Sequence, residues 1–217
     1  MENNKPKKFY ISDLHLEHQN AINFDKRPFD TIEQMHNTIE NNWNNTVTNS
    51  DTVYILGDMI WIKNDDIISL CAKLKGHKIL IQGNHDYRAL RDLRIRNIFD
   101  EILPYAEVKD VDNNGKQCDV ILSHYPILMW NKQHRGSIHL YGHVHNSREW
   151  GFYQDTLQQL KYFIDIENKQ DNRQENFNPI AINVGCMIDY MNYTPKTLKE
   201  LLSYDYNKYI DRKIPKY

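Results

Sequence analysis

The feature that most limits the fold of this chain is a series of six short apolar runs spaced along nearly its whole length. The runs are rich in β-branched and aromatic residues and are bounded by Gly, Asp or Asn, a composition typical of core strands. They occupy residues 9–11, 52–56, 78–81, 119–122, 138–141 and 180–184. Stretches with helical character lie between them, and this alternation predicts an α/β protein.

Helices are predicted over residues 30–43, 65–74 and 88–102, the last with a basic face. In the first of them Met35, Ile39 and Trp43 share one face, and Thr31 is the expected N-cap. A fourth helix is expected over residues 194–212, because it opens with the threonine and first-turn proline typical of a helix start.

Two segments depart from this alternation. An Asn-Asn-Gly turn at residues 113–115 predicts a hairpin between two short strands within residues 110–118. Part of residues 146–179 could form one helical face, but residues 167–178 are almost wholly polar. We expect residues 146–179 to be an insertion or lid loop that covers the site or forms a subunit contact. All 217 residues are predicted to form a single domain.

Composition narrows the classes of function. With 27 basic and 29 acidic residues the formal net charge is -2, so there is no basic excess to bind duplex DNA through counterion release. The three cysteines are far apart in the sequence, which favours a reducing compartment over a disulfide framework. No apolar run approaches the ~20 residues of a membrane span, so we expect a cytoplasmic protein without a membrane partner.

Polar residues follow five of the apolar runs, at the point where each strand should end. They are Asp13 and His15, Asp58, then Asn84, His85 and Asp86, then His124, and finally His143 and His145. The carboxyl ends of strands in an open α/β sheet lie along one edge, so these side chains should meet in one crevice. The D-x-H and H-x-H spacings also direct both side chains of a pair to the same face.

These side chains have the chemistry of a metal centre. Carboxylate and amide oxygens mixed with imidazole nitrogens suit borderline divalent ions such as Mn²⁺, Fe²⁺ or Zn²⁺ better than Ca²⁺, and the absence of thiolate argues against a structural zinc site. Glycines precede Asp58, Asn84 and His143, and they let the backbone turn sharply where a side chain would crowd the ions. The sequence therefore predicts a site for divalent cations.

In chain order, the motifs DLH, GD, GNHD, SH and GHVH resemble those of the calcineurin-like metallophosphoesterase superfamily. The resemblance extends over residues 9–202, and the D-x-H-x-x-H-x-N spacing of the first motif is similar to that of small bacterial and phage members. It implies a four-layer αββα sandwich, in which two mixed β-sheets are flanked by helices. It also implies two divalent metal ions per chain, Mn²⁺ foremost, with Fe²⁺, Zn²⁺ or Ni²⁺ as the other choices.

The same resemblance assigns a role to each motif residue. One ion is expected to be held by Asp13, His15 and His145. The other is expected to be held by Asn84, His124 and His143, and Asp58 is expected to bridge the two. A hydroxide trapped between the ions would attack the phosphate. His85 would be the general acid that protonates the leaving oxygen, and Asp86 would orient the imidazole of His85.

One departure from the resemblance concerns phosphate binding. The protein Ser/Thr phosphatases of the superfamily carry a phosphate-clamping arginine after the GD motif, whereas residues 59–62 of this chain are Met-Ile-Trp-Ile. Arg88, Arg91 or Arg135 could substitute for it, and the sequence leaves the choice open. The residues expected to contact substrate are His18, Arg88 and His134.

The predicted function is hydrolysis of a phosphodiester or phosphomonoester bond by a dinuclear metal enzyme. The expected partner is a small phosphorylated substrate, such as a nucleotide or an RNA end, and Trp61 could stack on a base or simply pack. One alternative is a non-catalytic scaffold or binding protein on the same fold, although such relatives usually lose ligands and none is lost here. A Ser/Thr-phosphatase-like or nuclease-like phosphoesterase is another. The sequence does not indicate the oligomeric state.

Overall fold

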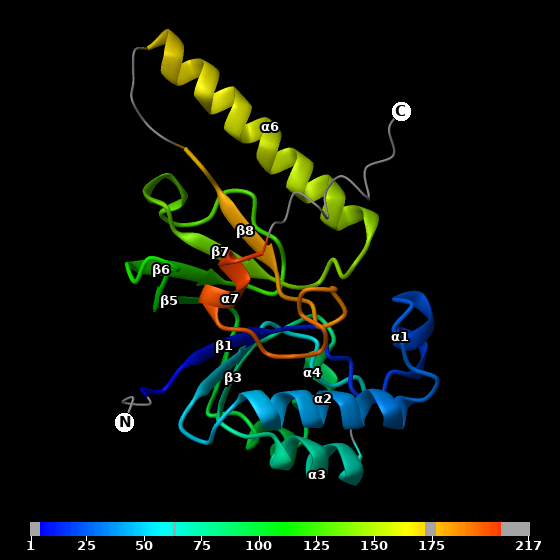
Figure 1. Ribbon diagram of the computed structural model, residues 1–217. Coiled ribbons are helices and arrows are strands. Elements are labelled where there is room, and N and C mark those ends of the chain that lie inside the picture. The colour runs from blue at the N-terminus through cyan, green and yellow to red at the C-terminus, as the bar shows by residue number, and fades with distance from the viewer. Residues whose placement is uncertain (1–4, 63, 172–176, 205–217) are drawn as a thin grey trace.

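The computed structural model describes residues 5–62, 64–171 and 177–204, which form two four-stranded sheets flanked by helices (Figure 1). The first sheet contains, in spatial order, β1 (Lys8–Ile11), β2 (Thr52–Ile55), β3 (His77–Ile81) and β4 (Glu101–Leu103). All neighbouring strands in it are parallel. The α/β class predicted from the sequence is confirmed.

The second sheet contains, in spatial order, β5 (Ala106–Val111), β6 (Gln117–Leu122), β7 (Ile138–Tyr141) and β8 (Ile180–Asn183). β5 and β6 form the predicted antiparallel hairpin, and the other neighbours are parallel. Among the described strands this sheet alone is mixed, whereas the resemblance implies two mixed sheets. The first sheet is purely parallel because helical crossovers, rather than tight hairpins, connect its strands.

The connections between the first three strands contain α1 (Gln19–Phe24), α2 (Ile32–Thr46) and α3 (Asp65–Lys73). α2 begins at the predicted N-cap, where the Thr31 side chain accepts a hydrogen bond from the backbone N–H of Gln34 (3.2 Å). Met35, Ile39 and Trp43 of α2 are buried, as their helical spacing predicts. Figure 1 shows α2 and α3 together on one side of the first sheet.

The helix predicted over residues 88–102 is replaced by two short helices and a strand. α4 (Asp86–Ala89) and α5 (Leu93–Arg96) are separated at Asp92, whose side chain accepts a hydrogen bond from the N–H of Arg94 and so caps α5. The chain then extends into β4, which pairs with β3. This pairing satisfies backbone groups at the edge of β3, so the tertiary context overrides the helical pattern.

The lid loop predicted over residues 146–179 is instead largely helical. α6 (Arg148–Gln170) spans most of the segment and runs away from the sheets at its far end (Figure 1). Gln154 ties the first part of the helix to the second sheet by donating hydrogen bonds to the hydroxyl of Tyr141 and the carbonyl of Ala181. Of the polar residues 167–178 that suggested a loop, residues 167–170 form the last turn of this helix, and residues 172–176 lie outside the described residues.

The last helix is also shorter than predicted within the described residues. α7 (Leu198–Leu202) begins at Thr197, which forms a capping box with Glu200. It starts late because Lys196 first pairs with Tyr10 beside the first sheet. Residues 205–212 of the predicted helix lie outside the described residues. Across the described part of the chain, none of the helices combines the length and the apolar character needed to cross a membrane.

The carboxyl ends of the two sheets meet through the strands β1 and β8. Ser12, just after β1, bridges Gly185, which follows β8, and the N–H of Ser12 donates to the carbonyl of Val184 (2.9 Å). Buried side chains from both sheets belong to one hydrophobic cluster. The loops that follow β1, β2, β3, β6 and β7 are thereby brought to one region.

Candidate metal centre

The residues predicted as metal ligands lie in these loops, and several have left-handed backbone conformations. Their φ angles are 56° at Asp13, 49° at His15, 52° at Asp58, 69° at His143 and 47° at His145. Such angles are uncommon for residues other than glycine. Backbone strain of this kind gathers at functional sites, where the surrounding structure holds it in place.

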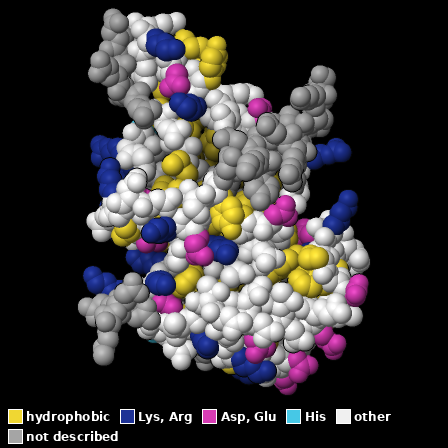
Figure 2. All heavy atoms as spheres, in the orientation of Figure 1, with side chains coloured by type: hydrophobic (Ala, Val, Ile, Leu, Met, Phe, Trp, Pro, Cys, Tyr) yellow, Lys and Arg dark blue, Asp and Glu magenta, His cyan; other side chains and the backbone are white. Residues whose placement is uncertain are grey.

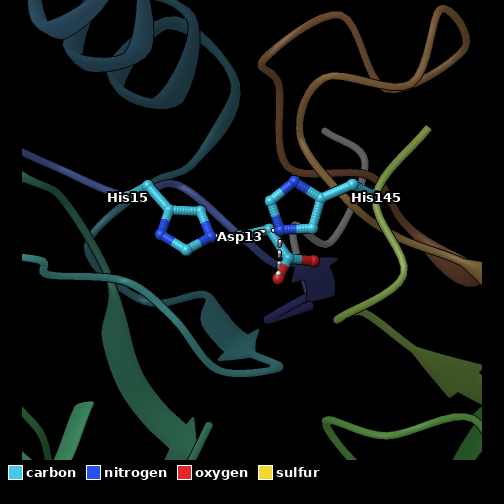
Figure 3. A group of neighbouring side chains, drawn as sticks. All are labelled: Asp13, His15 and His145. Carbon is cyan, nitrogen blue, oxygen red and sulfur yellow. Dashed lines mark hydrogen bonds and ion pairs between the residues drawn. The ribbon is translucent and has the colours of Figure 1, made fainter. Parts of the chain in front are cut away.

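One group of side chains with the geometry of a cation site consists of Asp13, His15 and His145 (Figure 3). The two imidazoles face each other, with 3.2 Å between the Nε2 atoms of His15 and His145. Oδ1 of Asp13 lies 3.7 Å from Nε2 of His145. Asp13 and His15 are buried, and His145 is half-buried. Three donor atoms thus converge on a point that one divalent ion could occupy.

A second group consists of Asp13, Asp58 and His124, all of them buried. Oδ2 of Asp58 lies 3.5 Å from Nε2 of His124 and 3.8 Å from Nε2 of His15. Nε2 of His124 also lies 2.9 Å from Oδ1 of Asn84. Asp58 therefore stands between the two predicted sets of ligands.

His143 lies beside both groups. Its ring centroid is 5.0 Å from that of His124, and its backbone N–H donates to both carboxylate oxygens of Asp13 (3.1 and 3.0 Å). Asp13 belongs to both groups, whereas the resemblance implies that Asp58 alone is shared. With this difference, the structure brings all the predicted metal ligands together.

Two glycines leave the space that the carboxylates occupy. A Cβ atom at Gly142 would lie 2.5 Å from Oδ2 of Asp13, and one at Gly83 would lie 2.3 Å from Oδ1 of Asp58. The sequence prediction attributes these glycines to sharp turns beside the ligands. The structure gives a different reason, the close approach of a carboxylate from a neighbouring loop.

Sequence reasoning missed a buried ion pair behind the first group, formed by Asp25 and Arg27. Oδ1 of Asp25 lies 2.8 Å from Nδ1 of His145, and Oδ2 accepts hydrogen bonds from Nε (2.9 Å) and Nη2 (2.8 Å) of Arg27. Arg27 also donates to the backbone carbonyls of Asp13 and Leu14. A histidine that donates one ring N–H to a carboxylate presents its other nitrogen to a metal. An acid and a base two positions apart are common on surfaces, so the sequence carries no distinctive signal for this pair.

Burial and neighbouring charges shift the pKa values of the centre strongly. Burial, with a smaller effect of His145, lowers the pKa of His15 to about 2. Burial alone would raise the pKa of Asp58, but the hydrogen bond and charge of His124 lower it to about 2. Burial alone would lower the pKa of His124, but its interactions with Asp58 and Asp13 raise it to about 9. At neutral pH the protein groups by themselves thus place an imidazolium at His124 beside a carboxylate.

Cation binding is expected to release the extra proton of His124. Nδ1 of His124 faces the carbonyl of Leu56 at 2.8 Å while Nε2 faces Asn84, so both ring nitrogens carry protons, and an ion on Nε2 must displace one of them. Because the pKa of His124 is raised to about 9, the apparent affinity for Mn²⁺ should rise with pH up to that value and level off above it. The slope should approach about tenfold per pH unit for a single proton.

Calorimetric titration with Mn²⁺ at neutral pH, in two buffers of different ionisation enthalpy, measures the released proton directly. Equal heats in the two buffers, or an affinity independent of pH, would contradict this assignment.

His85 lies at the rim of the centre, while Asp86 does not take its predicted role. Nε2 of His85 is 3.9 Å from Oδ2 of Asp58, and 40% of its side chain is exposed. The carboxylate of Asp86 accepts hydrogen bonds from the backbone N–H groups of Asp58, Met59 and Gly83. Asp86 therefore fixes the loop that carries Asp58, because backbone donors occupy the oxygens that were predicted to orient His85.

A cavity of about 940 Å³ extends from the metal ligands to solvent. Near the centre it is lined by His15, His85, His143 and His145. Farther out it is lined by side chains that include His18, Phe24, Lys26, Trp61, Glu149 and Asp189. A ligand in this cavity would contact both the candidate metal centre and His85.

The three residues predicted to contact substrate lie in different parts of the structure, and one of them, His18, lines the cavity. There its ring stacks on Trp61 at 3.7 Å. Arg88 is exposed, and its Nε donates a hydrogen bond to the hydroxyl of Tyr87. His134 lies in a 3₁₀ turn before β7 and packs against Phe177. His134 precedes β7, whereas the ligands His143 and His145 follow it. His134 therefore lies near the amino ends of the strands, away from the metal ligands at their carboxyl ends.

Within the described lining of the cavity, no arginine takes the place of the phosphate-clamping arginine. Among the described residues that line the cavity, the basic side chain is Lys26. The sequence offered three arginines as substitutes, and none of them lines the cavity: Arg88, Arg91 and Arg135.

The residues of the centre fit a pair of divalent cations. The donor atoms within each group lie within 4.8 Å of one another. Two imidazole nitrogens that face each other at 3.2 Å need a proton or a cation between them. Carboxylate oxygens and imidazole nitrogens without thiolate suit Mn²⁺, Fe²⁺ or Zn²⁺.

Fold and site together define an α/β protein with two helix-flanked sheets and a candidate cation centre at their carboxyl edge. No protein-family model matches the chain. The chain is 44% identical over 80 residues to the uncharacterized protein MJ1445 of Methanocaldococcus jannaschii, a match that covers 36% of this chain and 46% of that protein. The chain thus spans about half the length of this relative. It is also 27% identical over 160 residues to the gene 66 protein of Mycobacterium phage L5, covering 64% of this chain and 77% of that protein.

A solved structure supports the fold. The chain is similar to the protein of unknown function AQ665 from Aquifex aeolicus, with a TM-score of 0.54 and 22% sequence identity, over 96% of this chain and 100% of that chain. At this level of identity the likeness concerns the fold and not the activity. The function therefore has to be argued from the site.

Proposed function

We propose that this chain is a metal-dependent phosphoesterase of the calcineurin-like superfamily. The observation that carries the proposal is the convergence of the predicted ligands, with Asp58 3.8 Å from His15 and 3.5 Å from His124. Two helix-flanked sheets that open their carboxyl ends to one centre also fit the four-layer αββα sandwich of that superfamily.

In this proposal the chain holds two divalent cations, Mn²⁺ foremost. One cation is bound by Asp13, His15 and His145. The other is bound by Asn84, His124 and His143, and Asp58 binds both. When bound, such cations neutralise charge on a phosphate and lower the pKa of water enough to supply a nucleophile at neutral pH.

His85 is the residue placed to donate a proton to the leaving oxygen. Its backbone N–H donates to Oδ1 of Asp58 (2.9 Å), which fixes the residue beside the centre. The ring of Trp61 packs beside that of His85, with 4.5 Å between the ring centroids. Packing by Trp61 thus takes the orienting role that the sequence comparison assigns to Asp86, and the exposed part of the His85 ring can be reprotonated from solvent.

Hydrolysis of nitrophenyl phosphate esters tests the proposal. The purified chain with Mn²⁺ is expected to hydrolyse bis(4-nitrophenyl) phosphate or 4-nitrophenyl phosphate, and the ratio of the two rates distinguishes a diesterase from a monoesterase. Chelation of the metal should remove the activity. The proposal would be wrong if neither ester were hydrolysed in the presence of any divalent metal.

The His85→Ala variant is expected to lower kcat by about 10²–10⁴-fold, the usual contribution of a general acid. Binding of Mn²⁺, measured by calorimetry, should persist because His85 is not among the proposed ligands. His77→Ala is the control, since 60% of that side chain is exposed and it pairs with Asp100 outside the cavity. An unchanged kcat in His85→Ala would assign the proton donor to another group.

The charge distribution bears on the choice of substrate. Figure 2 shows Lys and Arg interspersed with Asp and Glu on the visible face, without a continuous basic field. On this face the arrangement gives no support to binding of duplex DNA, which requires clustered basic side chains. A non-catalytic binding protein on the same fold would bind Mn²⁺ without turnover, an outcome that the same assay would reveal.

A further inference from the structure

The cavity beside the centre is far larger than a phosphate group requires. Its volume of about 940 Å³ lies near the upper end of the ~300–1,000 Å³ of pockets that enclose drug-sized ligands. Beyond the metal ligands, its walls come from the end of α1, the start of α6 and the turn after β8. A substrate that fills it has a sizeable organic group attached to the phosphate.

The charges of the outer cavity do not suit a polyanion. The described lining residues there include one lysine, Lys26, and the carboxylates of Glu149 and Asp189. Asp25 also lines the cavity, but the buried guanidinium of Arg27 already pairs with it at 2.8 Å. A nucleic-acid strand or a polyphosphate would meet more anions than cations. The organic group therefore carries no negative charge, and the negative charge of the substrate is confined to the reacting phosphate.

An aromatic wall, formed by Trp61, His18 and Phe24, lines the cavity from beside His85 to beside His145. The ring of His18 stacks on that of Trp61 at 3.7 Å, and Trp61 lies 4.5 Å from His85. Phe24 completes the wall, 5.5 Å from His18 and 5.8 Å from His145. Its side chain lines the cavity and is nevertheless 54% exposed. A planar ring packed on Phe24 would remove this apolar surface from water and add the edge-to-face or offset contact that aromatic pairs favour.

We propose that the substrate is a phosphoester whose leaving group is an alcohol without negative charge that carries a planar aromatic or heteroaromatic ring, which packs on Phe24. The inference rests on the proposed function, because the leaving oxygen must lie beside the proton donor His85, which is next to Trp61 at one end of the aromatic wall. In the reaction, water supplies the oxygen that bonds to phosphorus while the bond from phosphorus to the alcohol oxygen breaks. His85 gives its proton to the alcohol oxygen and is reprotonated from solvent, while the attacking water releases one proton to solvent.

Two alcohols of matched acidity and size separate ring aromaticity from general apolar burial. The full-length protein with Mn²⁺ is assayed on the phosphate monoesters, and on the methyl phosphate diesters, of 2-phenylethanol and 2-cyclohexylethanol. For the class of ester that it hydrolyses, kcat/KM is expected to be about threefold to tenfold higher with the phenyl compound. Phe24→Leu, which keeps an apolar side chain, should reduce this preference to less than about twofold. Phe152→Leu should leave it unchanged, because Phe152 is a 74% exposed phenylalanine of α6 outside the cavity lining.

The outcomes separate this inference from the proposed function. Hydrolysis without a phenyl preference, or with a preference that survives in Phe24→Leu, overturns the inference and leaves the phosphoesterase standing. If no ester is hydrolysed, the proposed function fails, and calorimetry with the non-hydrolysable 2-phenylethyl and 2-cyclohexylethyl phosphonates decides the inference. A Phe24-dependent preference for the phenyl phosphonate supports the aromatic site, and equal affinities overturn it.

Discussion

The Asp58→Asn variant is expected to lose Mn²⁺-dependent phosphoesterase activity by about a thousandfold or more, since charge stabilisation by bound metal contributes several kcal/mol. The carboxylate of Asp58 lies between His15 and His124, at 3.8 and 3.5 Å from their Nε2 atoms. A neutral amide at that point cannot balance the charge of two cations. Metal analysis after dialysis should find fewer than two ions per chain, and nitrophenyl ester hydrolysis gives the rate.

Asp51→Asn is the matched control for this variant. Asp51 is also buried, 4% exposed, and its carboxylate accepts hydrogen bonds from the backbone N–H groups of Lys7 and Thr48, outside the centre. Its substitution should lower the free energy of unfolding by ~1–3 kcal/mol without changing the number of bound ions. Two bound ions and full activity in Asp58→Asn would contradict the proposed bridging role.

The Asp25→Asn variant is expected to weaken one cation site and spare the other. The direct contact of Asp25 with a proposed ligand is to Nδ1 of His145 in the first group, at 2.8 Å. Loss of such an outer carboxylate typically lowers metal affinity by about 10–100-fold, because the imidazole loses its orientation and part of its basicity. Calorimetric titration should therefore show one of two Mn²⁺ binding steps displaced, with the other unchanged.

Asp189→Asn provides the control for Asp25→Asn. Asp189 is an exposed carboxylate that lines the same cavity, so its substitution removes the same charge without touching a ligand. Equal weakening of both binding steps in Asp25→Asn would point to a general loss of structure. Weakening in Asp189→Asn of the same size would point to a long-range charge effect instead.

Much of the fold could be predicted because its signals are local. Each of the six apolar runs coincides with a strand, since β-branched and aromatic composition between turn residues reflects a preference of the run itself. Thr31 and the spacing of Met35, Ile39 and Trp43 likewise predicted α2. The predicted metal ligands meet because they directly follow strands whose carboxyl ends the fold brings to one edge.

The predictions that failed concern segments whose local preferences are weak or conflicting. Residues 101–103 adjoin a helical pattern but join β3 as β4. Residues 148–170, predicted as part of a loop, are helical because the first turns of α6 pack on the second sheet. His134 sits in a suggestive loop, yet that loop leads into the start of β7. Sequence proximity to a motif does not reveal on which edge of a sheet a residue lies.

By itself, the sequence determined which side chains are delivered to the ends of the strands, because strand pattern and ligand spacing are properties of neighbouring residues. Only the tertiary structure decided what surrounds them. The pairing of Asp25 with His145 joins residues 120 positions apart, and the backbone donors that occupy the Asp86 carboxylate come partly from a different loop. Such contacts form because buried polar groups on packed elements must find hydrogen-bond partners. Which partner each group finds depends on the packing of distant segments, and no local pattern of residues encodes it.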